Sequence, residues 1–140
     1  MAPPLRWESG ATVRGMPLKL LIIDDESALV AALRDYLEQR GFECECAFEA
    51  AEAQAVLAHM SFDVVLIDIY LSPLREADGL RVLSFIRERS IDVRLIVMTA
   101  HSTPELESEV IRLGADALLQ KPTSLALLAD TLTALAKGAR

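Results

Sequence analysis

The sequence predicts an α/β fold in which five βα units form one doubly wound parallel sheet. Three observations predict it. Short apolar runs recur along the chain, each run is followed by a stretch with helical spacing, and most of the runs lack polar alternation. Strands that are covered by helices on both faces have this uninterrupted apolar pattern. Consecutive βα units wind their helices onto both faces of a single sheet.

The second of the five strands alternates between glutamate and cysteine, so it is expected at an edge of the sheet. Gly41 and Gly114 follow the first and fourth helical stretches and are expected to end them. Each glycine has an arginine in the preceding turn, where a cation favours the end of a helix. The expected strand and helix pairs are 19–23 with 27–40, 43–48 with 49–60, 64–67 with 79–89, 93–98 with 104–113, and 117–119 with 124–136.

Length and composition indicate one domain, at residues 18–137, between an extension and a short tail. The 140 residues are 52% hydrophobic and 25% charged, as in soluble globular proteins. Residues 1–17 are rich in proline and glycine and show no period, so they are expected to be a flexible extension, non-native or upstream of a start at Met16. Residues 138–140 are the expected tail.

The charge and the apolar pattern exclude several classes of partner. A net charge of −7 argues against direct binding to nucleic acid, because phosphate backbones select basic surfaces. No apolar run approaches the roughly 20 residues of a membrane span, and the start lacks the apolar centre of a signal peptide. A cytoplasmic location is therefore expected. Cys44 and Cys46 are expected to be small, half-buried apolar residues without a mutual disulfide.

Polar side chains stand at the ends of four of the apolar runs. Asp24 and Asp25 follow the first, Asp68 the third and Thr99 the fourth, while Lys121 comes shortly after the fifth. Parallel strands present their carboxyl ends at one edge of a sheet, where open α/β sheets bind ligands. We therefore expect these five side chains to meet in one site.

Three carboxylates at one edge need a counter-charge, because two of them 4 Å apart repel by about 4 kcal/mol at an effective dielectric of 20. Lys121 supplies one positive charge, and Mg²⁺ would supply two through the oxygen ligands that it prefers. An ionised Asp68 is then a candidate nucleophile towards phosphorus, with Thr99 and Lys121 as partners for the phosphoryl oxygens. Taken singly, each group has a simpler explanation as a helix cap, a turn residue or a solvated lysine.

The chain from Leu18 to about Lys137 strongly resembles the receiver domain of two-component response regulators. That resemblance implies a flavodoxin-like (βα)5 fold with strand order 2-1-3-4-5. The motifs occur in the family's order and at suitable intervals. They are Leu21-Ile22-Ile23-Asp24-Asp25-Glu26, Val65-Leu66-Ile67-Asp68, Asp78-Gly79-Leu80, Val97-Met98-Thr99-Ala100, Gly114-Ala115-Asp116-Ala117 and Lys121-Pro122.

The resemblance also implies roles for the site residues. Asp68 would accept a phosphoryl group from a phosphohistidine on a sensor histidine kinase or a histidine phosphotransfer protein. Thr99 and Lys121 would hold the phosphoryl oxygens and couple phosphorylation to the fourth and fifth helices. In the fifth helix, Leu125, Leu128, Leu132 and Leu135 are expected to form one core stripe. Leu127 lies off that stripe, and it is either part of a homodimer or partner surface or a stray exposed leucine. The domain would be regulatory, catalysing only its own phosphorylation and dephosphorylation. The implied Mg²⁺ ligands are Asp24, Asp25, Asp68 and the backbone carbonyl of Tyr70.

The sequence departs from the family's pattern near the acceptor. The family commonly has a proline four residues and a glycine eight residues after the acceptor, whereas Pro73 and Gly79 stand five and eleven residues after Asp68. Leu118 replaces the aromatic residue often found three positions before the lysine, so a ring cannot act as the usual rotamer switch. Thr123 replaces the aromatic or apolar residue common after Lys-Pro.

Two further positions are expected to affect the lifetime of the phosphoryl group. In the receiver framework, Tyr70 and His101 border the path of the hydrolytic water. A bulky ring there can exclude water from in-line attack, and a histidine can orient the water. The alternative is that both residues are ordinary loop residues that face the solvent.

Other classes fit the sequence less well. A haloacid-dehalogenase-like phosphatase needs a second carboxylate two residues after its nucleophile, and Tyr70 occupies that position. A flavodoxin or Rossmann nucleotide binder needs a phosphate-cradling loop after its first strand, where acidic residues 24–26 would repel phosphate. A non-phosphorylated pseudo-receiver is expected to lack at least one of the five key groups, and all five are present.

Overall fold

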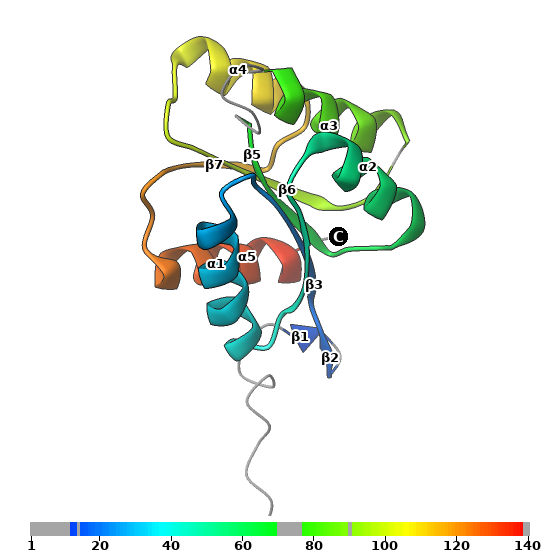
Figure 1. Cartoon of the computed structure of the whole chain (residues 1–140), viewed down its shortest axis with the longest axis vertical. Helices are drawn as coiled ribbons and strands as arrows, with labels where there is room; N and C mark the ends of the chain where they lie inside the picture. The colour runs from blue at the N-terminus through cyan, green and yellow to red at the C-terminus, as the bar shows by residue number, and fades with distance from the viewer. Residues whose placement is uncertain (1–11, 14, 70–76, 90, 139–140) are drawn as a thin grey trace, which may run out of the picture.

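The computed structural model describes residues 12–13, 15–69, 77–89 and 91–138, and its centre is a parallel sheet of five strands (Figure 1). The order across the sheet is β4-β3-β5-β6-β7. Counted in chain order, these five strands have the order 2-1-3-4-5, so the expected topology is confirmed, and the alternating strand β4 lies at an edge. The strands are β3 (Lys19–Ile23), β4 (Glu43–Ala47), β5 (Val64–Asp68), β6 (Arg94–Thr99) and β7 (Ala117–Gln120).

Within the described residues, five helices cover the sheet in two layers (Figure 1). Helices α1 and α5 lie on one face, and α2, α3 and α4 lie on the other. Gly41 and Gly114, just beyond the first and fourth of these helices, both have φ of +97°, which a glycine adopts without the steric cost of a Cβ. The helices are α1 (Ser27–Gln39), α2 (Ala50–His59), α3 (Ala77–Glu88), α4 (Pro104–Arg112) and α5 (Leu125–Lys137).

Each face of the sheet has its own hydrophobic core. Along β3, Leu20 and Ile22 belong to the core under α1 and α5, whereas Leu21 and Ile23 belong to the core under the other three helices. This alternation follows from the two-residue period of a strand and explains why residues 20–23 of β3 and 64–67 of β5 are all apolar. Helix α5 contributes the expected stripe, in which Leu128 and Leu132 are buried and Leu125 and Leu135 are partly buried.

The two cysteines face the core under α1 and α5 without forming a disulfide. Cys44 is buried and Cys46 is half-buried. Burial raises the pKa of the Cys44 thiol to about 12, so this thiol is protonated at neutral pH. The expectation of small apolar residues at these positions is confirmed.

Part of the expected N-terminal extension has regular structure. Strands β1 (Thr12–Val13) and β2 (Met16–Pro17) pair antiparallel, and Gly15 between them has φ of +76°. A residue with positive φ suits the tight connection between two such strands. Four residues of the expected flexible extension thus form paired strands, and strands of two residues are too short to show a period in the sequence. Residues 1–11 lie outside the described part of the chain.

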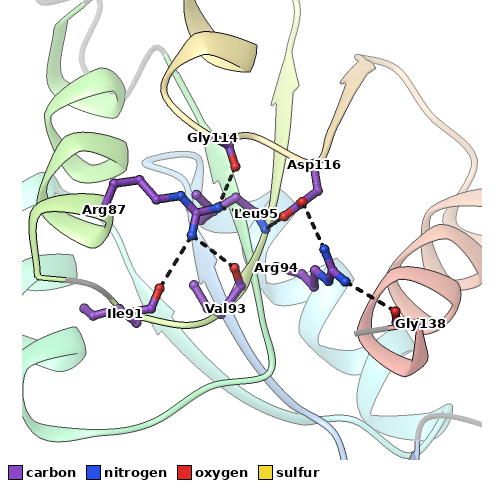
Figure 2. A network of polar contacts seen from close by, with 8 residues as sticks. All are labelled: Arg87, Ile91, Val93, Arg94, Leu95, Gly114, Asp116 and Gly138. Atoms are coloured by element: carbon purple, nitrogen blue, oxygen red, sulfur yellow. Dashed lines mark hydrogen bonds and ion pairs between the residues drawn. The ribbon is translucent and has the colours of Figure 1, made fainter. Parts of the chain in front are cut away.

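At the amino edge of the sheet, a polar network joins helices that lie far apart in the sequence (Figure 2). We call Arg87, Arg94 and Asp116, with their backbone partners, the amino-edge network. Arg87, in the last turn of α3, donates to the carbonyl of Gly114 between α4 and β7. Asp116 accepts a hydrogen bond of 2.8 Å from the Leu95 N–H and one of 3.2 Å from Arg94, which also donates to the Gly138 carbonyl after α5.

Candidate functional site

Three carboxylates meet at the carboxyl edge of the sheet, as expected. Asp24 directly follows β3, and Asp68 is the last residue of the neighbouring strand β5. Carboxylate oxygens of Asp24, Asp25 and Asp68, one from each, lie within 4.8 Å of one another. The parallel register of β3 and β5 explains this convergence, because Ile23 pairs with Ile67 one residue before the two acids. The separation in sequence is 44 residues, so only the sheet brings these groups together.

Lys121 reaches this cluster from the turn after β7. Its Nζ donates hydrogen bonds of 2.8 Å to Asp24 and 2.9 Å to Asp68. The Lys121 N–H donates to the Thr99 carbonyl at 2.8 Å, which fixes the base of the side chain. Burial acts to lower the pKa of the Lys121 ammonium, but the hydrogen bonds and charges of Asp24 and Asp68 outweigh burial, and the pKa is raised. The ammonium therefore stays charged and bridges the two carboxylates.

The two adjacent acids after β3 differ in environment. Asp24 is 2% exposed, and besides Lys121 it accepts a hydrogen bond of 2.9 Å from the Glu26 N–H. Asp25 is exposed at the surface of the cluster. Partial desolvation and then the negative charge of Asp24 raise the pKa of Asp25. Asp25 does not cap α1, because the N-cap residue is Glu26.

Thr99 lies at the same edge, as the last residue of β6, and is fully buried. Its hydroxyl accepts a hydrogen bond of 3.2 Å from the His101 N–H and lies 3.4 Å from the His101 carbonyl. His101 itself is exposed in the connection to α4. The structure thus puts Thr99 at the expected edge, with its hydroxyl held by the loop that leads to α4.

The remaining predicted site residues have different outcomes. Leu118 is half-buried and packs against the core under α2, α3 and α4. Tyr70 lies outside the described residues, so its predicted carbonyl ligand stays a prediction. The sequence did not reveal the backbone contacts of the site, above all the Glu26 N–H on Asp24 and the close approach of Gly79 to Ile69. The one feature of the sequence that could have indicated the contact between Gly79 and Ile69 is a glycine at the start of a helix.

The donor set of the cluster fits a divalent cation. With all four groups ionised, three carboxylates face one ammonium, which leaves two negative charges in excess. Carboxylate oxygens are the hard ligands that Mg²⁺ binds in proteins. The exposed Asp25 leaves the cluster open to a hydrated ion, and Mg²⁺ usually keeps several of its waters.

Comparisons with known proteins identify the family. Residues 20–133 match the family described as response regulator receiver domain, which is most of the chain. The chain therefore belongs to the receiver domain family of two-component signalling.

Similar proteins include regulators and a kinase. The alginate biosynthesis transcriptional regulatory protein AlgB of Pseudomonas putida is 35% identical over 106 residues, which cover 76% of this chain and 23% of AlgB. The sensor histidine kinase RcsC of Escherichia coli is 29% identical over 88% of this chain and 13% of RcsC. The chain thus spans less than a quarter of these relatives.

Solved structures agree with the family and the fold. The receiver domain of the Francisella response regulator 1452 has a TM-score of 0.79 and 27% identity, over 88% of this chain and 99% of that chain. In the described part of our chain, no helix has the length and apolar character needed to cross a membrane.

Proposed function

We propose that this domain is the phosphoacceptor of a two-component or phosphorelay system, with Asp68 as the residue that becomes phosphorylated. The observation that carries the proposal is the Lys121 ammonium, 2.9 Å from Asp68 and 2.8 Å from Asp24, with Asp25 beside them. The phosphoryl donor would be a phosphohistidine on a sensor histidine kinase or a histidine phosphotransfer protein. We further propose a cytoplasmic location for this reaction.

In the proposed reaction, an oxygen of ionised Asp68 attacks the phosphorus atom. A bond from this oxygen to phosphorus forms while the phosphorus–nitrogen bond of the phosphohistidine breaks, and the electron pair stays on the imidazole nitrogen. Lys121 is close enough to Asp68 to donate to a phosphoryl oxygen after a small movement. The protein contributes position and charge, which account for most of the catalysis of phosphoryl transfer.

Asp24, Asp25 and Asp68 would hold a Mg²⁺ ion, together with the predicted Tyr70 carbonyl. The ion would supply positive charge for the oxygens of the transferred group. Asp24 is suited to orient such a site, because the Glu26 N–H and Lys121 hold its two oxygens in place.

The proposed output passes through Thr99 and Lys121 to the surface formed by α4, β7 and α5. For Thr99 to donate to a phosphoryl oxygen, its hydroxyl must turn away from the His101 carbonyl, which lies in the loop before α4. Leu127 on α5 and Ile111 on α4 are 55% and 64% exposed, unlike most large apolar side chains of the described part. We propose that a second copy of the domain covers this surface after phosphorylation.

A mass measurement tests the proposed acceptor. Incubation of the protein with acetyl phosphate and Mg²⁺ should add about 80 Da as a labile adduct, because the acyl phosphate transfers its phosphoryl group to a carboxylate. Asp68→Asn should remove the adduct. Asp35→Asn, at an exposed position of α1, is the matched control and should retain it. An unmodified parent protein, or an adduct that persists in Asp68→Asn, would contradict the proposal.

Light scattering tests the proposed output surface. Beryllofluoride with Mg²⁺ should increase the mass of the particle, and Leu127→Glu should prevent that increase by placing a charge in the apolar contact. Met60→Glu is the control, since Met60 is 42% exposed at the end of α2, outside this surface. Equal behaviour of Leu127→Glu and the parent protein would exclude the surface.

A further inference from the structure

Gly79, in the first turn of α3, lies directly against the backbone that follows the acceptor. Its N–H donates a hydrogen bond of 3.2 Å to the Ile69 carbonyl. A Cβ at position 79 would stand 2.4 Å from the Ile69 Cα and 2.6 Å from the Ile69 oxygen. Both atoms belong to the backbone, so no side-chain rotation can relieve this overlap.

Position 79 requires glycine because there is no room for a Cβ atom beside the Ile69 backbone. Gly79 is buried and is not among the glycines with positive φ. A glycine within a helix costs roughly 0.5–1 kcal/mol relative to alanine. The close packing of α3 on the end of β5 offsets this cost, because only a residue without a side chain allows that approach.

Ile69 connects this contact to Asp68. The ladder between β5 and β6 ends with Asp68 opposite Met98, so Ile69 is the first residue beyond the paired strand. Ile69 is itself fully buried, and a shift of its backbone cannot be absorbed by movement into solvent. Relief of the overlap to an ordinary contact of 3.4 Å requires a shift of about 1 Å, next to a carboxylate that is 2.9 Å from Lys121.

The geometry points to Gly79 as a positioning residue for the acceptor Asp68: its contact with Ile69, and not the number of residues in the connection to α3, holds Asp68 at bonding distance from Lys121. This inference rests on the proposed function of Asp68. It also explains how the chain can place Gly79 eleven residues after Asp68 and still form the pair with Lys121.

The experiment compares Gly79→Ala with the parent protein under acetyl phosphate and saturating Mg²⁺. The initial phosphorylation rate per folded molecule should fall ten- to hundredfold, because a misplacement of about 1 Å has effects of that size. Saturating Mg²⁺ keeps any loss of metal affinity out of this rate, since Asp24 and Asp25 follow β3 whereas Asp68 adjoins Ile69. A purely structural role would lower the folded fraction and leave the rate per folded molecule unchanged.

Gly114→Ala is the matched control at the opposite edge of the sheet. Its Cβ would lie 2.4 Å from the Arg87 Nε, at φ of +97°, so this variant should also lose stability. Its phosphorylation rate per folded molecule should equal that of the parent. Equal rates in Gly79→Ala and the parent, or an equal loss in Gly114→Ala, would overturn the inference.

Two measurements keep the test decisive if a variant does not fold or the parent is not phosphorylated. In the parent, the Gly79 amide should exchange as slowly as core amides of α3, although first-turn amides lack helical partners; fast exchange would overturn the inference. A parent without any adduct would refute the proposed function alone. The inference is then decided by the NMR chemical shifts of the Asp68 and Lys121 backbone amides, which should move in Gly79→Ala but not in Gly114→Ala, and unchanged shifts in Gly79→Ala would overturn it.

Discussion

The two edges of the sheet both place aspartates beside cations, yet they balance charge differently. At the amino edge, Asp116 lies 3.2 Å from Arg94 and 3.9 Å from Arg87, and backbone carbonyls accept further hydrogen bonds from both arginines (Figure 2). At the carboxyl edge, Lys121 bridges Asp24 and Asp68 while Asp25 stands beside them. The amino-edge network has two cations for one acid, and the cluster at the carboxyl edge has one cation for three acids.

This difference separates a structural network from a site that is prepared for a ligand. The amino-edge network joins the ends of α3, α4 and α5 to β6 and β7, so its hydrogen bonds serve to hold elements together. At the carboxyl edge, partial desolvation and then the negative charge of Asp24 raise the pKa of Asp25, so the ionised carboxylate opposes folding. Charge left unbalanced in this way is what we expect of the phosphorylation site proposed here.

The largest effect is expected from removal of a carboxylate at the carboxyl edge. Asp25→Ala should abolish measurable Mg²⁺ binding, because affinity depends on the number of carboxylate ligands. Without metal, the free energy of unfolding should stay equal or rise slightly, since one of three crowded charges is gone. Titration with Mg²⁺ and urea denaturation measure the two effects. Asp35→Ala is the control, because Asp35 is an exposed acid of α1 outside the cluster. An unchanged titration would disprove the metal assignment.

Removal of the Asp116 carboxylate at the amino edge should have the opposite result, a loss of stability without a loss of function. Asp116→Ala should lower the free energy of unfolding by about 2–3 kcal/mol, because it leaves the Leu95 N–H without its acceptor and removes Asp116 as a partner of Arg94, which keeps the Gly138 carbonyl. Asp116→Asn keeps an acceptor for the Leu95 N–H and should cost less than half as much. Urea denaturation provides both values, and phosphorylation per folded molecule should not change. If Asp116→Ala is as stable as the parent, the network does not hold these elements together.

Smaller effects sharpen the description of the carboxyl edge. Tyr70 is predicted to restrict the hydrolytic water, so Tyr70→Asn should shorten the half-life of the phosphoryl group about tenfold, which corresponds to ~1.4 kcal/mol in the barrier. His101→Asn should have a weaker effect, because His101 is exposed and its imidazole is smaller than the tyrosine ring, so it excludes less water. Loss of the adduct over time gives the half-lives. Identical half-lives for Tyr70→Asn and the parent would show that the ring does not protect the site.

The smallest effect is a dependence of stability on pH. The raised pKa of Asp25 means that the folded protein binds a proton more tightly there than the unfolded chain does. This contribution to stability is present below the ordinary value of 3.8 and is lost as the pH rises through the folded-state pKa. Asp25→Asn should therefore be slightly more stable than the parent at pH 7, and the difference should vanish in acid. A difference that is independent of pH would show that charge is not its cause.

Local pattern was sufficient for most of the fold. The runs that became β3, β5 and β6 are apolar because helices cover both faces, and the alternation in β4 identified an edge strand. Gly41 and Gly114 ended their helices as expected. The short pairing of β1 with β2 was missed, because two-residue strands have no period to detect. The pairing of β1 with β2 depends on the turn at Gly15, which has positive φ.

The sequence by itself determined which polar residues meet at the carboxyl edge of the sheet, because the position of a polar residue at the end of an apolar strand is a local property. Asp24, Asp68 and Lys121 were identified in that way. Only the tertiary structure decided that one ammonium bridges two of the three acids, that the Thr99 hydroxyl is held by the His101 backbone, and that Gly79 lies against Ile69. These are contacts between elements far apart in the chain or contacts of backbone atoms. Distances of this kind follow from how helices and strands pack, and no residue pattern encodes them.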